Sequence, residues 1–287
     1  MKFSVLLSVY KNENPKFLDS ALYSIFDQTK IPNEVVLVED GKLTDELYDV
    51  IKKYKTRYSK ILKTVSFKNN RGLGLALRDG LLHCSNEIVF RMDTDDISVK
   101  SRFEKQLKIF KNYDVDVVGS NIEEFDNNMF ECVGYRVVPK DDVDIKKIAK
   151  RRNPLNHVTI GYKKSKVLAA GNYEKMDYFE DYYLWIKMMK KNCKFYNIQD
   201  DLVLVRGGSN MINRRGGIKY IKSIINFEKS ILKIKFINRI DYIKNIFIRI
   251  IVSITPNKLR TILYKKILRK NKYNKKEVLL WNSFNLN

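Results

Sequence analysis

The first 120 residues alternate short apolar runs with stretches in which apolar residues recur at helical spacing. Apolar runs bounded by polar residues predict strands, whereas recurrence every three to four residues predicts amphipathic helices. The chain is therefore expected to form strands at 3–9, 34–38, 61–67 and 87–91, and helices at 15–28, 44–58 and 74–82. This alternation predicts an α/β fold, in which helices flank a mostly parallel, Rossmann-like sheet.

Two further elements are expected beyond residue 115. Residues 116–122 are predicted to form a strand and residues 179–192 a helix. The helical spacing predicts a buried side formed by Leu184, Trp185, Met188 and Met189. The opposite side is formed by Tyr183, Ile186, Lys187 and Lys190. Glu180 and Asp181 fall in the first turn of this helix. The helix dipole favours carboxylates there by about 0.3–1 kcal/mol, which is a structural reason for both acids.

The composition indicates a folded protein with an ordinary core. The chain has 287 residues, of which 44% are hydrophobic, enough for one large α/β domain with an appendage. No uncharged run approaches the roughly 20 residues that span a bilayer, so no transmembrane segment is expected. The apolar N-terminus lacks a small-residue cleavage site, which favours a first strand over a signal peptide. Three widely spaced cysteines indicate a reducing compartment, and the protein is expected to be cytoplasmic.

The positive charge is concentrated toward the C-terminus. The whole chain has a net charge of +22, and residues 206–276 hold 20 Lys and Arg against only Glu228 and Asp241. The rest of the chain is therefore nearly neutral. This asymmetry predicts a body over residues 1–217 and a basic extension over residues 218–287.

The extension is expected to be helical. A helical spacing relates Ile243, Ile246, Phe247, Ile250, Ile251 and Ile254, with Lys244 and Arg249 off that face. Thr255-Pro256 predicts the start of another helix over 257–270. Basic amphipathic helices bind anionic membranes, where each Lys or Arg contributes about 1 kcal/mol. One alternative is a helical cover packed on the body. Another is a non-enzymatic nucleic-acid binder, although no familiar nucleic-acid motif is present.

Polar clusters follow three of the predicted strands, at residues 8–13, 38–41 and 91–98. Ligands bind at the carboxyl ends of parallel strands, so these clusters are candidate site residues. The last cluster contains Asp93, Asp95 and Asp96, whose oxygens suit a hard divalent cation. A helix-loop-helix calcium site requires Gly where this chain has Ser98. An Asp-x-Asp phosphatase is a closer alternative, but such enzymes place the motif on the first strand.

Seven segments, taken in order, resemble glycosyltransferase family 2, the nucleotide-diphosphosugar transferases of the GT-A fold. They are SVLLSVYKNE, LDSALYSIFDQT, EVVLVEDG, NNRGLGLALRDGL, RMDTDDIS, NPLNHVTI and YFEDYYLW. The resemblance runs from Ser4 to about Gly217. It implies a GT-A catalytic domain over residues 1–217, with a nucleotide-sugar-binding part over about 1–120 and an acceptor-binding part over about 121–217.

The segment NMINRRGGIKY further resembles bacterial members that build O-antigen or capsular repeats. The resemblance implies an inverting enzyme that moves a sugar from a UDP-sugar to a hydroxyl of a glycan acceptor. A polyprenyl-diphosphate-linked acceptor is expected, with the protein peripheral at the inner face of the cell membrane. The sequence does not indicate the donor sugar, the linkage or the oligomeric state.

The resemblance also implies roles for residues on the donor side. The position of Asp95 ligates Mn²⁺ or Mg²⁺ between the donor phosphates, and Asp93 lies against the donor ribose and sugar beside the metal. Asp96 either braces the turn or joins the site. The position of Asp40 hydrogen-bonds the uracil, and that of Arg71 approaches the nucleotide. The structural alternative for Asp40 is a residue that forms the turn before Gly41, and the alternative for Arg71 is a solvated cation on a loop.

The remaining expected site residues line the base pocket and the acceptor side. Ser8, Val9 and Tyr10 are expected to line the base pocket, with Glu13 nearby. The family's general base matches Asp181. A role in orienting or contacting the acceptor is expected for Glu180, and His157 has either a site role or a structural one.

Overall fold

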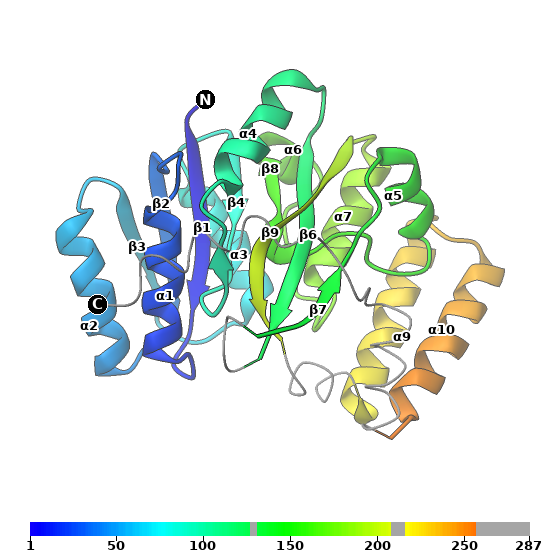
Figure 1. The fold of residues 1–287 in the computed structure, drawn as a ribbon. Helices are drawn as coiled ribbons and strands as arrows, with labels where there is room; N and C mark the ends of the chain where they lie inside the picture. The colour runs from blue at the N-terminus through cyan, green and yellow to red at the C-terminus, as the bar shows by residue number, and fades with distance from the viewer. Residues whose placement is uncertain (127–130, 208–215, 257–287) are drawn as a thin grey trace.

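The computed structural model describes residues 1–126, 131–207 and 216–256. Within these residues nine strands form one mixed sheet, shown at the centre of Figure 1. The strands are β1 Phe3–Val9, β2 Glu34–Asp40, β3 Leu62–Phe67, β4 Ile88–Arg91, β5 Ile97–Ser98, β6 Val117–Phe125, β7 Cys132–Arg136, β8 Gly161–Lys163 and β9 Phe195–Arg206. Their order in the sheet is β3-β2-β1-β4-β8-β6-β9-β5, and β7 pairs with β6.

Helices cover both faces of this sheet (Figure 1). They are α1 Pro15–Phe26, α2 Asp45–Arg57, α3 Leu73–His83, α4 Arg102–Asn112, α5 Asp142–Ile148, α6 Lys164–Ala169, α7 Glu180–Lys190, α9 Gly217–Lys233 and α10 Arg239–Ile254. The strands and helices predicted in the first 120 residues are confirmed, with bounds that differ by at most two residues. The mostly parallel α/β architecture is also confirmed.

The parallel part of the sheet explains where the site forms. Strands β1, β2, β3 and β4 run parallel, with Ser8 opposite Val38 and Leu6 opposite Arg91. Parallel pairing brings the carboxyl ends of β1, β2 and β4 to one edge of the sheet. Strand β8 is antiparallel to both β4 and β6, which joins the two halves of the sheet.

Strand β1 is buried on both faces, which explains its nearly continuous apolar sequence. Val5 and Leu7 belong to the core cluster under α1 and α2, whereas Leu6 belongs to the cluster under α3 and α7. Fully burying such aliphatic side chains stabilises the fold by about 1.5–3 kcal/mol each. The sheet edge that carries the site is therefore anchored in two cores.

The helix α7 is buried on both sides, and the prediction that Tyr183 and Ile186 lie away from its buried side is wrong. Ile186 is fully buried because α9 packs over it through Ile224, Phe227 and Ile231. The Phe227 ring stacks on Phe179, with centroids 4.6 Å apart. A single-helix periodicity cannot show this second partner.

The described part of the basic extension, residues 218–256, is helical, as predicted, and α9 and α10 lie side by side at one end of the molecule (Figure 1). Helix α9 supplies a cover for α7. Helix α10 lies outside α9 and presents apolar side chains to the surroundings. The helix predicted over 257–270 lies outside the described residues. Among the described helices, none is both long enough and apolar enough to cross a bilayer.

Strand β9 contains a half-buried carboxylate, Asp201, that makes stability depend on pH. Oδ1 of Asp201 is buried and has no hydrogen-bond partner within the described residues. Burial, followed by the negative charge of Glu123, raises the pKa of Asp201 from 3.8 to about 7. The folded state therefore favours the protonated acid. Its stabilising contribution is complete below pH 3.8 and is lost as the pH rises through about 7.

Replacing Asp201 by Asn is expected to remove this loss. At pH 8 the variant should have a free energy of unfolding about 1–3 kcal/mol above that of the wild type, with a smaller difference at pH 5. Urea unfolding at the two pH values measures this. The neighbouring Asp200→Asn variant is the control, because Asp200 is exposed and paired with Lys105. A variant–wild-type difference that is the same at both pH values would contradict the expectation.

Candidate active site

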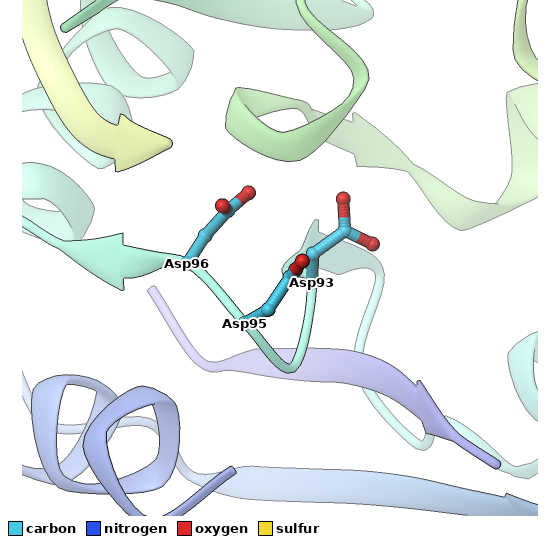
Figure 2. A group of neighbouring side chains, drawn as sticks. All are labelled: Asp93, Asp95 and Asp96. Carbon is cyan, nitrogen blue, oxygen red and sulfur yellow. The ribbon is translucent and has the colours of Figure 1, made fainter. Parts of the chain in front are cut away.

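Three carboxylates gather on the loop between β4 and β5. One oxygen from each of Asp93, Asp95 and Asp96 lies within 4.8 Å of the others, and Figure 2 shows the three side chains on this short turn. Asp96 is buried, and the other two are half-buried. The sequence prediction that these acids come together at the carboxyl end of β4 is therefore confirmed.

The last residue of β4, Arg91, compensates part of this negative charge. Its guanidinium is buried and donates to the Asp93 carboxylate. Nε and Nη1 of Arg91 have no hydrogen-bond partner among the described residues. A buried guanidinium is costly unless it is paired, so Arg91 and Asp93 depend on each other.

Burial opposes the ionisation of the acids on this loop. Burial, then repulsion by Asp93 and Glu13, raises the pKa of Asp95 from 3.8 to about 7. The pKa of Asp96 is also raised, by burial first and then by Asp95. Asp96 accepts a hydrogen bond from the backbone N–H of Arg206 at 2.8 Å, so it connects the loop to β9. A bound cation would relieve the repulsion among these groups.

The residues fit a hard divalent cation. The cluster supplies only carboxylate oxygens, which Mg²⁺ and Mn²⁺ prefer. The Asp96 Oδ2 atom is buried without a hydrogen-bond partner in the described part of the chain. Asp95 and Asp93 are the expected ligands, and the Asp96 carboxylate belongs to the same cluster. A cation in this cluster would therefore compensate carboxylate charge that Arg91 only partly neutralises.

The loop after β1 adjoins the acidic turn. Glu13 Oε2 accepts a hydrogen bond of 2.6 Å from the Thr94 hydroxyl. Ser8 is half-buried and Tyr10 is exposed at the end of β1, where both can meet a ligand. The Val9 side chain is fully buried in the core, which leaves only its backbone for ligand contact. Glu13 thus connects the expected base pocket to the carboxylates.

Asp40, at the end of β2, organises the following glycine loop. Its two carboxylate oxygens accept from the backbone N–H groups of Arg71 and Gly72, at 2.9 and 3.0 Å. A Cβ on Gly41 would lie 2.8 Å from the Asn70 nitrogen, and φ is +91° there, so this turn requires glycine. Asp40 therefore shapes the loop, and each of its oxygens retains acceptor capacity for a ligand.

Arg71 is held in place beside Asp40. It forms an ion pair of 2.8 Å with Asp79, and its guanidinium lies 3.7 Å above the centre of the Phe67 ring. Nε and Nη2 have no partner among the described residues. Arg71 is thus a fixed cation whose two unpartnered nitrogens are buried, which differs from the expected alternative of a solvated loop cation.

Asp181 lies in the first turn of α7. It accepts a hydrogen bond of 2.7 Å from the Asn153 side chain. Burial raises its pKa, although the Tyr182 backbone N–H, Asn153 and the charge of Arg91 oppose this rise. An acid with a raised pKa is a stronger proton acceptor than an ordinary aspartate, as a general base requires.

Glu180 lies next to a cleft of about 240 Å³, whose lining includes Arg71, Gly74, Lys175 and Lys219. Burial, then repulsion by Asp181, raises its pKa to about 7. Gly74 allows α3 to approach the start of α7 closely, because a Cβ at this position would lie 3.1 Å from the Glu180 Cβ. The cleft brings Arg71 and Glu180, which are distant in sequence, to one place.

His157 lies between aromatic side chains. One ring nitrogen is 3.0 Å from the Tyr173 hydroxyl, and the ring meets Trp185 edge-on. Burial and the charge of Arg91 lower its pKa well below the usual value, so the imidazole is neutral. His157 is therefore a buried, neutral side chain within electrostatic reach of Arg91.

Sequence analysis missed three residues that shape this site: Arg91, Asn153 and Arg206. Arg91 influences the pKa values of Asp95 and Asp181, so both acids lie within electrostatic reach of one guanidinium. Arg206 donates from Nε to the Asp95 carbonyl and stacks 3.5 Å above the Phe17 ring. Arg91 lies two residues before Asp93, which is the one signal that could have identified it.

Comparison with known proteins agrees with this geometry. Residues 4–166 match the family model described as glycosyl transferase family 2. The chain belongs to glycosyltransferase family 2. This family 2 enzyme is 39% identical over 270 residues to the UDP-Gal:alpha-D-GlcNAc-diphosphoundecaprenol beta-1,3-galactosyltransferase of Escherichia coli, which covers 94% of the chain and 97% of that relative. It is 37% identical to the amylovoran biosynthesis glycosyltransferase AmsE of Erwinia amylovora, over 92% of the chain and 98% of that relative.

Solved structures share the fold of this family 2 enzyme. The S. aureus TarS 1–349 structure in complex with UDP-GlcNAc superposes with a TM-score of 0.62 at 21% identity, covering 81% of this chain and 67% of TarS 1–349. The mannosyltransferase PcManGT from Pyrobaculum calidifontis, in complex with GDP-Man and Mn²⁺, superposes with a TM-score of 0.61 at 14% identity. The match covers 98% of this chain and 79% of PcManGT. The GT-A fold and the transferase interpretation are thus confirmed, over the phosphatase and nucleic-acid alternatives.

Proposed function

We propose that this family 2 enzyme transfers a sugar from a UDP-sugar to a hydroxyl of a polyprenyl-diphosphate-linked glycan, with inversion and with Mn²⁺ or Mg²⁺. The observation that carries the proposal is the placement of two acidic groups around Arg91. One group is the metal-type cluster at the end of β4, and the other is the Glu180–Asp181 pair at the start of α7. This arrangement would give the donor phosphates and the acceptor base separate positions.

On the donor side, Asp95 and Asp93 would hold the cation. When bound, it would neutralise the charge that builds on the departing diphosphate. The loops that carry Ser8, Tyr10 and Asp40 would bind the uridine, and Arg71 would bring its positive charge to the nucleotide. Arg91 would hold Asp93 against the donor ribose and sugar.

On the acceptor side, Asp181 would remove the proton from the attacking hydroxyl. The acceptor oxygen then forms a bond to the anomeric carbon, while the bond from that carbon to the diphosphate oxygen breaks. UDP leaves with the electron pair, and the proton stays on Asp181. Asn153 would keep the Asp181 carboxylate aligned, and Glu180 would contact the acceptor in the adjoining cleft.

The lipid-linked acceptor is supported by the name of the Escherichia coli relative, whose acceptor is a diphosphoundecaprenol-linked sugar. We assign the catalytic role to residues 1–217 and membrane proximity to residues 218–287. A peripheral place at the inner face of the membrane would bring the enzyme to such an acceptor. A panel of nucleotide sugars tests the donor: UDP-sugars should raise the melting temperature with Mn²⁺ and much less without it. Equal stabilisation with and without Mn²⁺ would count against the metal site.

A further inference from the structure

Helix α10 turns its polar side toward the protein. Asn245 and Ser253 are buried on this side. The Asn245 side-chain nitrogen donates to the Lys150 carbonyl at 2.8 Å and to Glu228 of α9 at 3.1 Å. An ordinary surface helix does the opposite and buries its apolar side. The rotation of α10 about its axis is therefore set by polar contacts.

A buried ion pair fixes this rotation. Arg249 Nε lies 2.9 Å from Glu228 Oε1, and the Glu228 side chain is fully buried. Arg249 also donates to the Arg151 carbonyl at 2.9 Å. Turning α10 to bury its apolar side would leave Glu228 charged and unpaired, which is strongly unfavourable. The contacts of Arg249 and Asn245 therefore keep the apolar side of α10 facing outward.

The outward side of α10 is an apolar stripe. Its side chains recur every three to four residues and are between 45% and 66% exposed: Ile240, Ile243, Phe247, Ile248, Ile251 and Ile254. The helix has 16 residues, so the stripe extends along a rod of about 24 Å. Figure 1 shows α10 at the outer edge of the molecule, with α9 between it and the sheet. No described element covers the stripe.

The charges around the stripe identify its partner. All fully exposed charged side chains of residues 216–256 are Lys or Arg, including Lys235, Arg239 and Lys244 around the start of α10. The two acids of this segment, Glu228 and Asp241, are buried and half-buried. The following residues, 257–287, add nine Lys and Arg against one Glu. A second copy of this surface would bring like charges together, whereas an anionic bilayer complements both the charge and the apolar stripe.

We propose that the outward side of α10 is a membrane-binding surface that lies flat on a bilayer containing anionic lipids. Phe247 and Ile251 enter the boundary between headgroups and acyl chains, and Lys244 and Arg239 lie at the lipid phosphates. This assignment rests on the proposed function in one respect, since binding to the membrane would bring the enzyme to a lipid-linked acceptor. It differs from the sequence expectation by assigning α9 to the protein core and α10 to the lipid.

Vesicle co-sedimentation of the full chain tests the surface. The wild type is expected to bind vesicles containing phosphatidylglycerol, to bind phosphatidylcholine vesicles more weakly, and to be released by salt. The Phe247→Glu/Ile251→Glu variant should bind phosphatidylglycerol vesicles about 10- to 100-fold more weakly. Leu82→Glu/Val143→Glu is the matched control, because it places the same charges at two other exposed apolar positions and should bind like the wild type.

Three results would overturn the proposal. The first is vesicle binding that is unchanged in the α10 variant. The second is a wild type that ignores vesicles and forms a dimer that the α10 variant dissociates, which would make the stripe an interface between copies. The third is a monomeric wild type that ignores vesicles, which would favour residues 257–287 as the cover. A Mn²⁺-dependent melting shift with UDP, measured on the same proteins, separates failure of the proposed function from failure of this surface.

Discussion

The Asp181→Asn variant is expected to lose about 10²- to 10⁴-fold in turnover while its affinity for the UDP-sugar stays nearly unchanged. The amide cannot take the proton of the acceptor hydroxyl, but it has the shape of the carboxylate. Its oxygen can still accept the hydrogen bond from Asn153. Steady-state kinetics with the acceptor, together with UDP-sugar binding, separates the two effects.

The pH dependence gives an independent test of this base. Burial raises the pKa of Asp181, so the carboxylate form is reached only above the usual aspartate range. The acidic limb of kcat/KM should therefore lie above that range in the wild type and be absent from the residual activity of Asp181→Asn. Asp45→Asn is the control, because Asp45 is also a first-turn helix acid but is exposed. A fully active Asp181→Asn enzyme would exclude the base assignment.

The Asp95→Ala variant is expected to weaken Mn²⁺-dependent UDP-sugar binding at least about tenfold. Asp95 is the central carboxylate of the cluster, and its removal takes an oxygen ligand from the cation. The unliganded protein should remain folded, since the substitution also relieves repulsion with Asp93 and Glu13. Titration of UDP at fixed Mn²⁺, followed by melting temperature, measures both quantities.

Removal of the metal should reproduce this loss in the wild type. Adding a chelator to the wild type should reduce UDP-sugar binding to the level of Asp95→Ala, and the chelator should have little further effect on the variant. The exposed Asp49→Ala variant, on α2, controls for the loss of one negative charge. Wild-type affinity of Asp95→Ala at the same Mn²⁺ concentration would remove Asp95 from the metal site.

The sequence predicted the parallel half of the sheet because its strands are continuous apolar runs with a clear end. It did not predict β5 or β8, which have two and three residues and are defined by their partners. It also missed β9, whose middle contains Gln199, Asp200 and Asp201 and whose register against β6 shifts there. Such strands form because of tertiary pairing, which a local pattern does not contain.

The candidate site shows the same division. The cluster of acids at the end of β4 follows from their position directly after a buried strand. The role of Arg91 depends on its burial and on its closeness to Asp93 of the acidic loop and Asp181 of α7, which only the folded chain brings together. Helical spacing predicted an apolar side for α10, but it placed Ile246 and Ile250 there, which are half-buried in the structure. The side that packs inward depends on Glu228, a residue of another helix.

The most direct test of the account is the stereochemistry and metal dependence of the reaction itself. The enzyme is incubated with an α-configured UDP-sugar that it binds and with a short-chain, diphosphate-linked sugar acceptor, and the anomeric proton of the product is examined by NMR. We expect a new β-glycosidic linkage that forms with Mn²⁺ or Mg²⁺ and is absent when a chelator is present. An α-linked product, or the same rate in the presence of chelator, would contradict metal-dependent inverting transfer.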